Sequence, residues 1–323
     1  MAFTPSPAYA RLPPRTPTPD DPRFLDLLVD DAAGADLLLA GIPYDGAVIG
    51  RKGAKGGPDA IRESFRYLGS WDPAGGPAGL GLSLKGCRIH DLGDAAVVAG
   101  DTLATHALVR AQIADALRSR KPLVALGGDN SLSFPTFQAL HDTYGGRWGV
   151  VVVDAHYDLR AYQGQPTSGT PYRRILEEIP ERPVRGSDLV EFGIRAWANA
   201  PGLAAYAKEH GVRVVPAERL RSGDVAAAIR DALPRNGAVD QLFLSVDIDA
   251  LDQSIAPGCS APGAGGLPFP VAEAIVRIVG NDPRTRGMDL VEVAPNLDPT
   301  GNTARVAAQL VATFAGAVHG RTA

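Results

Sequence analysis

The sequence predicts an α/β protein in three layers, with a mostly parallel central sheet covered by helices on both faces. Short and very apolar runs recur along the chain after residue 35, as expected for parallel strands buried on both sides. Longer amphipathic runs separate them, which is the alternation of strand and helix in a parallel sheet. A closed barrel is the competing architecture. Both arrangements place functional sites at the carboxyl ends of the strands.

The short apolar runs are the expected strands. The run with four consecutive valines is typical, because it leaves no polar face for solvent. The strands are expected at 35–43, 122–129, 148–156, 189–195, 212–216, 242–249 and 287–293. The helices are expected at 102–120, 202–211, 224–234, 270–280 and 302–320, the last of which ends in a glycine.

Two segments differ in composition. Residues 1–34 are rich in proline and lack the apolar core of a signal peptide, so we expect an irregular N-terminal arm. Residues 35–323 contain neither a linker nor an internal repeat, and we expect them to form a single catalytic domain.

Composition argues against several classes of function. The net charge of −4 and the lack of Lys or Arg runs argue against a nucleic-acid partner. No stretch approaches the roughly 18 apolar residues of a membrane span. Cys87 and Cys259 are far apart and form no CxxC motif, which favours a reducing compartment. We therefore expect a cytoplasmic protein with a small-molecule substrate.

Acidic side chains gather at the ends of two expected strands. Asp154, His156 and Asp158 occupy every second position, so an extended chain projects them from one face. Asp247 and Asp249 stand in the same relation. Acids at this density repel one another unless cations neutralise them, and mixed carboxylate and imidazole ligands suit a divalent ion such as Mn²⁺. Two ions that share Asp154 and Asp247 would account for the number of acids.

A third strand ends in the loop Gly-Gly-Asp-Asn-Ser at 127–131. Glycines build such a tight loop, and a helix is expected to follow it. The residue closest to the expected chemistry is a neutral amide, Asn130. The residues alone leave three interpretations of Asn130: a metal ligand, a position at which a ligand has been lost, or a turn residue.

These motifs together resemble the ureohydrolase superfamily of arginases, agmatinases and formimidoylglutamases. The resemblance runs from about residue 37 to the C-terminus and rests on the order of DAHYD before SVDIDALD. Further matching motifs are GAKGGPDAIR at 53–62, DLGD at 91–94, GGDNS at 127–131 and DLVEVAP at 289–295. The resemblance implies an arginase-like fold, and it implies an oligomer, either a trimer or a hexamer.

The resemblance also implies roles for individual residues. In the superfamily, a hydroxide that bridges two manganese ions attacks an amidine-type carbon. Asp154 and Asp247 would bridge both ions, Asp158 would complete one shell, and His156 with Asp249 would complete the other. Glu292 would hold the cationic amidine or guanidine group of the substrate. Glu292 and Asp158 are therefore the expected catalytic residues.

Within the superfamily, the chain is most similar to formimidoylglutamases. The pattern Ser168-Gly169-Thr170 replaces the His-Gly-Thr typical of agmatinases, and the segments 255–267 and 302–310 also match the formimidoylglutamase subgroup. The implied reaction, part of histidine degradation, is hydrolysis of N-formimidoyl-L-glutamate to L-glutamate and formamide. An agmatinase or another guanidino C–N hydrolase is the alternative enzyme, and a metal-poor relative without catalysis is the other alternative. The expected substrate-binding residues are Arg160, Ser168, Arg195 and Asn199.

Asn130 departs from the superfamily, which usually has a histidine ligand at that position. An amide oxygen binds a hard cation more weakly than imidazole does. Asn130 either ligates one labile ion, directly or through water, or marks a subgroup that holds one ion firmly, or marks a degenerate site. We therefore expect two Mn²⁺ per subunit, with one as the alternative. The histidines at 106, 141 and 210 fall on expected helices and are predicted to be surface or capping residues.

Overall fold

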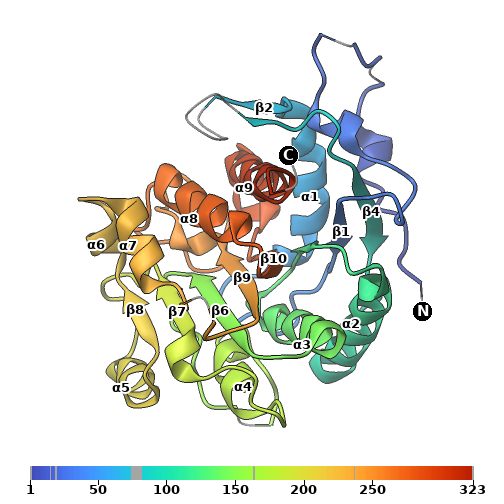
Figure 1. Ribbon diagram of the computed structural model, residues 1–323. Helices are drawn as coiled ribbons and strands as arrows, with labels where there is room; N and C mark the ends of the chain where they lie inside the picture. Colours follow the sequence, from blue (N-terminus) through green and yellow to red (C-terminus); the bar gives the residue numbers. More distant parts are fainter. Residues whose placement is uncertain are drawn as a thin grey trace.

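The architecture is known from a computed structural model of the chain (Figure 1). It describes residues 2–14, 16–18, 20–73, 82–162, 164–235 and 237–321. In this part of the chain, eight parallel strands form one sheet in the order β4-β1-β5-β10-β9-β6-β7-β8. The strands are β1 (Leu37–Gly41), β4 (Ile89–Asp94), β5 (Leu123–Leu126), β6 (Trp148–Val153), β7 (Leu189–Phe192), β8 (Arg213–Val215), β9 (Gln241–Asp247) and β10 (Thr285–Val291). The expected open, parallel sheet is confirmed.

Helices cover both faces of this sheet, which confirms the three layers (Figure 1). The helices on one face are α1 (Gly57–Ser64), α6 (Ala217–Leu220), α7 (Val225–Ala232), α8 (Phe269–Asn281) and α9 (Asn302–His319). Those on the other face are α2 (Thr102–Ala116), α3 (Ser133–Tyr144), α4 (Pro171–Glu177) and α5 (Pro201–His210). Side chains alternate between the two cores along each strand: Val151 and Val153 of β6 face the first group of helices, whereas Val150 and Val152 face the second.

The edge strand β4 was not among the expected strands, because its residues are mostly polar. Its two aspartates pair with Arg62 of α1, whose side chain is fully buried. Arg62 contacts Asp91 at 2.8 Å and Asp94 at 2.5 Å. Tyr9, in the N-terminal segment, donates its hydroxyl to Asp91 at 2.5 Å. Paired charges and the N-terminal segment thus cover a sheet edge that would otherwise be open to another strand.

Two smaller features complete the described chain. The strands β2 (Trp71–Asp72) and β3 (Leu82–Ser83) pair with each other in an antiparallel ribbon. Within the residues that the structure describes, no helix combines the length and apolar character needed to cross a membrane.

Candidate metal centre

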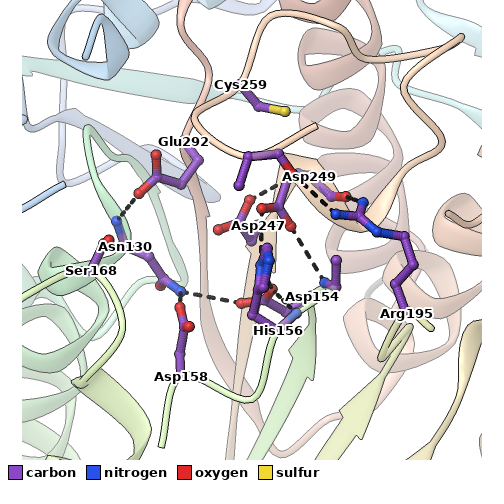
Figure 2. Close-up of polar contacts among 12 residues, drawn as sticks. Asn130, Asp154, His156, Asp158, Ser168, Arg195, Asp247, Asp249, Cys259 and Glu292 are labelled. Carbon is purple, nitrogen blue, oxygen red and sulfur yellow. Dashed lines mark hydrogen bonds and ion pairs between the residues drawn. The ribbon is translucent and has the colours of Figure 1, made fainter. Parts of the chain in front are cut away.

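The ends of β6 and β9 bring together five of the six predicted metal ligands, namely four aspartates and one histidine. These strands are neighbours, and Val153 pairs with Val246, so the next residues, Asp154 and Asp247, lie side by side. Two groups of potential ligands result, and both contain Asp154. One is Asp154, His156 and Asp249, and the other is Asp154, Asp158 and Asp247; within each group the ligand atoms lie within 4.8 Å of one another (Figure 2).

The centre carries an excess of buried negative charge. Burial, together with neighbouring carboxylates, raises the pKa of Asp154 to about 6. The same causes hold the pKa of Asp158 and that of Asp247 well above their ordinary value. Burial works to lower the pKa of His156, but its hydrogen bonds to Asp154 and Asp249 outweigh this and raise it to about 11. One imidazole cannot balance four carboxylates, so the donor set fits hard or borderline divalent cations such as Mn²⁺.

The acids are fixed by their own loops. The Asp154 carboxylate accepts the backbone N–H of His156 at 2.6 Å, and that of Asp247 accepts the N–H of Asp249 at 2.8 Å. Asp158 has a φ of 46° and Glu292 a φ of 66°, a left-handed conformation that few non-glycine residues adopt. Two of the predicted site residues therefore have a strained backbone conformation, which is common at functional sites.

Asn130 joins the predicted metal ligands to Glu292. Its backbone N–H donates to Glu292 Oε1 at 2.9 Å, and its side-chain nitrogen donates to Asp158 at 2.7 Å and Asp154 at 3.3 Å (Figure 2). Its side-chain oxygen accepts from the hydroxyls of Ser133 at 2.8 Å and Tyr172 at 3.2 Å. Hydroxyls both donate and accept, so a half-turn of the amide keeps these partners and presents oxygen to a cation.

Glu292 has one occupied and one open carboxylate oxygen. It follows β10 and is buried, and burial together with the nearby Asp129 raises its pKa well above the ordinary value. Among the described residues, Oε2 has no hydrogen-bond partner within 3.5 Å, although the nearby Ser260 side chain acts to lower the pKa of Glu292. A buried oxygen without a donor is costly, and a cationic N–H group would satisfy it.

The predicted substrate-binding residues fall into two groups. Arg195 is buried and donates to the backbone oxygens of Asp249 and Ala261, each at 3.2 Å. Asn199 donates to the Ala155 oxygen at 2.9 Å and accepts the Tyr157 N–H at 3.0 Å. Both side chains are therefore turned toward the backbone of the loops that carry the predicted metal ligands.

The second group lies at the outer end of the loop that follows Asp158. Ser168 Oγ accepts the N–H of Ile49 at 3.1 Å. Arg160 is exposed, and within the described chain its guanidinium makes no hydrogen bond, although its backbone N–H donates to Gly169 at 2.9 Å. Arg160 is therefore a cation without a hydrogen-bond partner among the described residues, two positions along the chain from the predicted ligand Asp158.

Sequence reasoning missed a buried polar network behind Asn130. Ser245 Oγ lies 2.9 Å from the Tyr172 hydroxyl and donates to Asp289 at 2.6 Å. The surface or capping role predicted for His106 is wrong, because its ring is buried between Ser131 at 3.1 Å and Arg174 at 3.2 Å. The helical pattern around His106 does not reveal that Arg174, on α4, lies beside its ring.

We expect the metal-free protein to lose stability as pH rises. Acids whose pKa is raised bind protons more tightly in the folded protein than in the unfolded chain. Their stabilising effect is complete below about pH 4, the pKa in the unfolded chain. It is lost as pH passes the pKa in the folded protein, which is about 6 for Asp154 and about 7 for Asp289. The raised pKa of His156 acts in the same direction above about pH 6.5. Calorimetry after chelation is expected to give a lower Tm at pH 8 than at pH 5.5, and Mn²⁺ is expected to raise Tm more at pH 8. A metal-free Tm that rises over this interval would contradict the burial of these acids.

Comparison with known proteins agrees with this geometry. Residues 35–316 match the model of the arginase family. The chain is 39% identical to the formimidoylglutamase of Halobacterium salinarum, over 93% of this chain and 96% of that protein. It is similar to the crystal structure of formimidoylglutamase from Bacillus subtilis, with a TM-score of 0.84, 32% identity, and coverage of 97% and 96% of the two chains. It is also similar to Trypanosoma cruzi formiminoglutamase with Mn²⁺₂, with a TM-score of 0.81, 30% identity, and coverage of 92% and 98%.

Proposed function

The chain belongs to the arginase family and is a hydrolase of amidine C–N bonds, and we propose that it converts N-formimidoyl-L-glutamate and water into L-glutamate and formamide, using manganese. The observation that carries the proposal is the pair of buried ligand groups that share Asp154, beside the open oxygen of Glu292. The relatives named formimidoylglutamase support the choice of substrate.

Two Mn²⁺ ions would be held by the two ligand groups, with Asp247 as a second shared carboxylate and Asn130 as the weakest ligand. When bound, such a pair of ions supplies a strongly activated water nucleophile at neutral pH. The rigid loops of Asp154 and Asp247 keep the ligands in place before the metal arrives. The ligands are thereby fixed around the position that the amidine carbon of the substrate would occupy.

Glu292 would bind the amidinium of the substrate. Its Oε1 is occupied by the Asn130 N–H, so Oε2 is left for the cationic N–H of the formimidoyl group. This contact would orient the sp² carbon toward the metal centre. Burial strengthens it, because charges of opposite sign attract more strongly away from water. Arg160 would pair with a carboxylate at the glutamate end, since guanidinium matches carboxylate with two parallel hydrogen bonds.

The test is a comparison of substrates with the same manganese-loaded protein. We expect release of glutamate from N-formimidoyl-L-glutamate and little or no turnover of agmatine or L-arginine, which lack a formimidoyl carbon. Faster turnover of a guanidino compound would overturn the choice of substrate and leave family membership intact.

Replacing Asn130 by histidine is expected to tighten the binding of one ion. Imidazole is a stronger ligand than an amide oxygen, and we expect roughly tenfold or greater retention of the second ion during dialysis against a weak chelator. An Asn-to-His variant of the Trypanosoma cruzi relative was also determined with Mn²⁺₂. Asn130→Ala serves as the control and is expected to retain less metal than the unmodified protein. Equal metal content in all three proteins would remove Asn130 from the ligand set.

Replacing Gly169 by alanine is expected to raise KM while leaving kcat nearly unchanged. A Cβ at this position would lie 2.6 Å from Cδ of Arg160, so the arginine stem must move. Losing a charged hydrogen bond to substrate costs about 1.5–3 kcal/mol, or roughly a ten- to hundredfold rise in KM. Gly202→Ala is the matched control, because nothing lies within 4 Å of a Cβ built there. An unchanged KM in Gly169→Ala would exclude Arg160 from substrate binding.

A further inference from the structure

We propose that Asp36, Cys87 and His319 form a separate zinc site at the end of the sheet opposite the manganese centre. Their ligand atoms lie within 4.8 Å of one another. Asp36 directly precedes β1 and Cys87 lies just before β4, whereas the catalytic acids follow the carboxyl ends of β6 and β9. The two sites therefore share no ligand.

Two of the three ligands are held together by the backbone. Asp36 donates its N–H to the Arg88 oxygen at 2.7 Å, and its Oδ2 accepts the Arg88 N–H at 2.9 Å. These reciprocal bonds fix Asp36 against the residue that follows Cys87 and leave the second carboxylate oxygen for a metal. The site is thus organised before binding, which lowers the entropic cost of coordination.

Cys87 supplies a buried thiol. It is 3% exposed, and in the described chain its sulfur makes no hydrogen bond. Burial and the neighbouring Asp36 raise its pKa to about 12, so without metal it is a neutral thiol. A bound zinc ion would displace the thiol proton to solvent and bind the thiolate.

His319 brings the end of α9 to this pair. The carboxyl end of a helix favours a nearby cation. The chain just beyond is anchored, since Arg321 donates to the backbone oxygens of Gly280 and Thr285, the latter at 3.1 Å. His319 is only partly buried, which leaves an entry path for metal and a position for water as the fourth ligand.

The ligand types separate this site from the manganese centre. Thiolate, imidazole and one carboxylate are a zinc donor set, whereas the catalytic set is dominated by carboxylate oxygens, which suit Mn²⁺. Zinc here would join β1, the segment before β4 and the last turn of α9. Because it would bind only the folded chain, zinc would raise the free energy of unfolding with the logarithm of its concentration above Kd.

Cobalt(II) is the probe that tests this site in the full-length protein. A cobalt–thiolate bond produces a near-ultraviolet charge-transfer absorption, and the catalytic ligand groups contain no thiol. We expect one equivalent of this absorption in the unmodified protein, its loss in Cys87→Ser and its retention in Cys259→Ser, the other buried cysteine. Absence of the absorption, or its persistence in Cys87→Ser, would overturn the proposal.

Zinc-dependent stability gives a second readout that does not depend on catalysis. With the protein already loaded with manganese, zinc is expected to raise the Tm of the unmodified protein and of Cys259→Ser, but not that of His319→Gln. His319→Gln guards against misfolding of the cysteine variant, since its amide preserves part of the side-chain volume. An equal rise in Tm in all variants would place zinc binding elsewhere.

Discussion

Asp154→Asn is expected to release both metal ions and to abolish hydrolysis. Asp154 is the one residue common to both ligand groups, and it is fully buried between them. Its loss is expected to weaken metal binding well beyond the roughly 10–100-fold change caused by altering a neighbour of a ligand. Metal analysis after gel filtration, together with glutamate release, measures both effects.

The variants Asp158→Asn and Asp249→Asn provide matched controls for this result. Each of these residues belongs to only one ligand group, so each variant is expected to retain one ion. Asp154 and Asp249 are buried and Asp158 is half-buried, and all three substitutions replace a carboxylate by an amide of the same size. If Asp154→Asn retained as much metal as the controls, Asp154 would not be a shared ligand.

Glu292→Gln is expected to lower kcat/KM on the order of 10²–10³-fold while leaving the metal content unchanged, an effect of the size seen when one charge-stabilising group is removed. Glutamine retains an acceptor for the Asn130 N–H, but its NH₂ group would face the substrate cation as a second donor. The expected loss of activity therefore arises at the Oε2 position, while the contact with the Asn130 N–H is kept. Steady-state kinetics and metal analysis on the same preparation check the prediction.

An unchanged Tm is the control for Glu292→Gln, since the variant must fold for its kinetics to be interpreted. Glu292 has a left-handed φ of 66°, and replacing its carboxylate by an amide does not change this backbone strain. Activity within a few-fold of the unmodified enzyme would exclude Glu292 from amidine binding.

The sequence was most informative where an apolar run reaches the site. The four valines predicted the strand, and the acidic residues after them predicted ligands at its end. The reason for their convergence was wrong, because β6 ends at Val153 and Asp158 has a left-handed φ of 46°, so these ligands lie in a loop and not in an extended chain. Asp247 is the last residue of β9, and Asp249 lies in the 3-10 turn Ile248–Ala250 that follows it. These positions are predictable because each follows or ends an apolar run, and the carboxyl ends of neighbouring parallel strands meet at one edge of the sheet.

Other features depend on contacts between distant segments and could not be predicted in this way. Strand β4 is mostly polar and half-buried, and its two aspartates pair with Arg62 from α1, which the sequence of the strand does not indicate. Arg195 and Asn199 occupy the expected loop, but the direction of their side chains is set by the metal-binding loops. The grouping of Asp36, Cys87 and His319 joins residues from both ends of the chain.

The most direct measurement is hydrolysis of N-formimidoyl-L-glutamate by manganese-loaded protein, with metal per chain determined on the same sample. The two ligand groups sharing Asp154 predict turnover with close to two ions per chain. Turnover with a single ion would preserve the substrate and contradict the shared centre. Two bound ions without turnover would contradict the proposed substrate, and a protein that binds neither ion nor substrate would contradict the account as a whole.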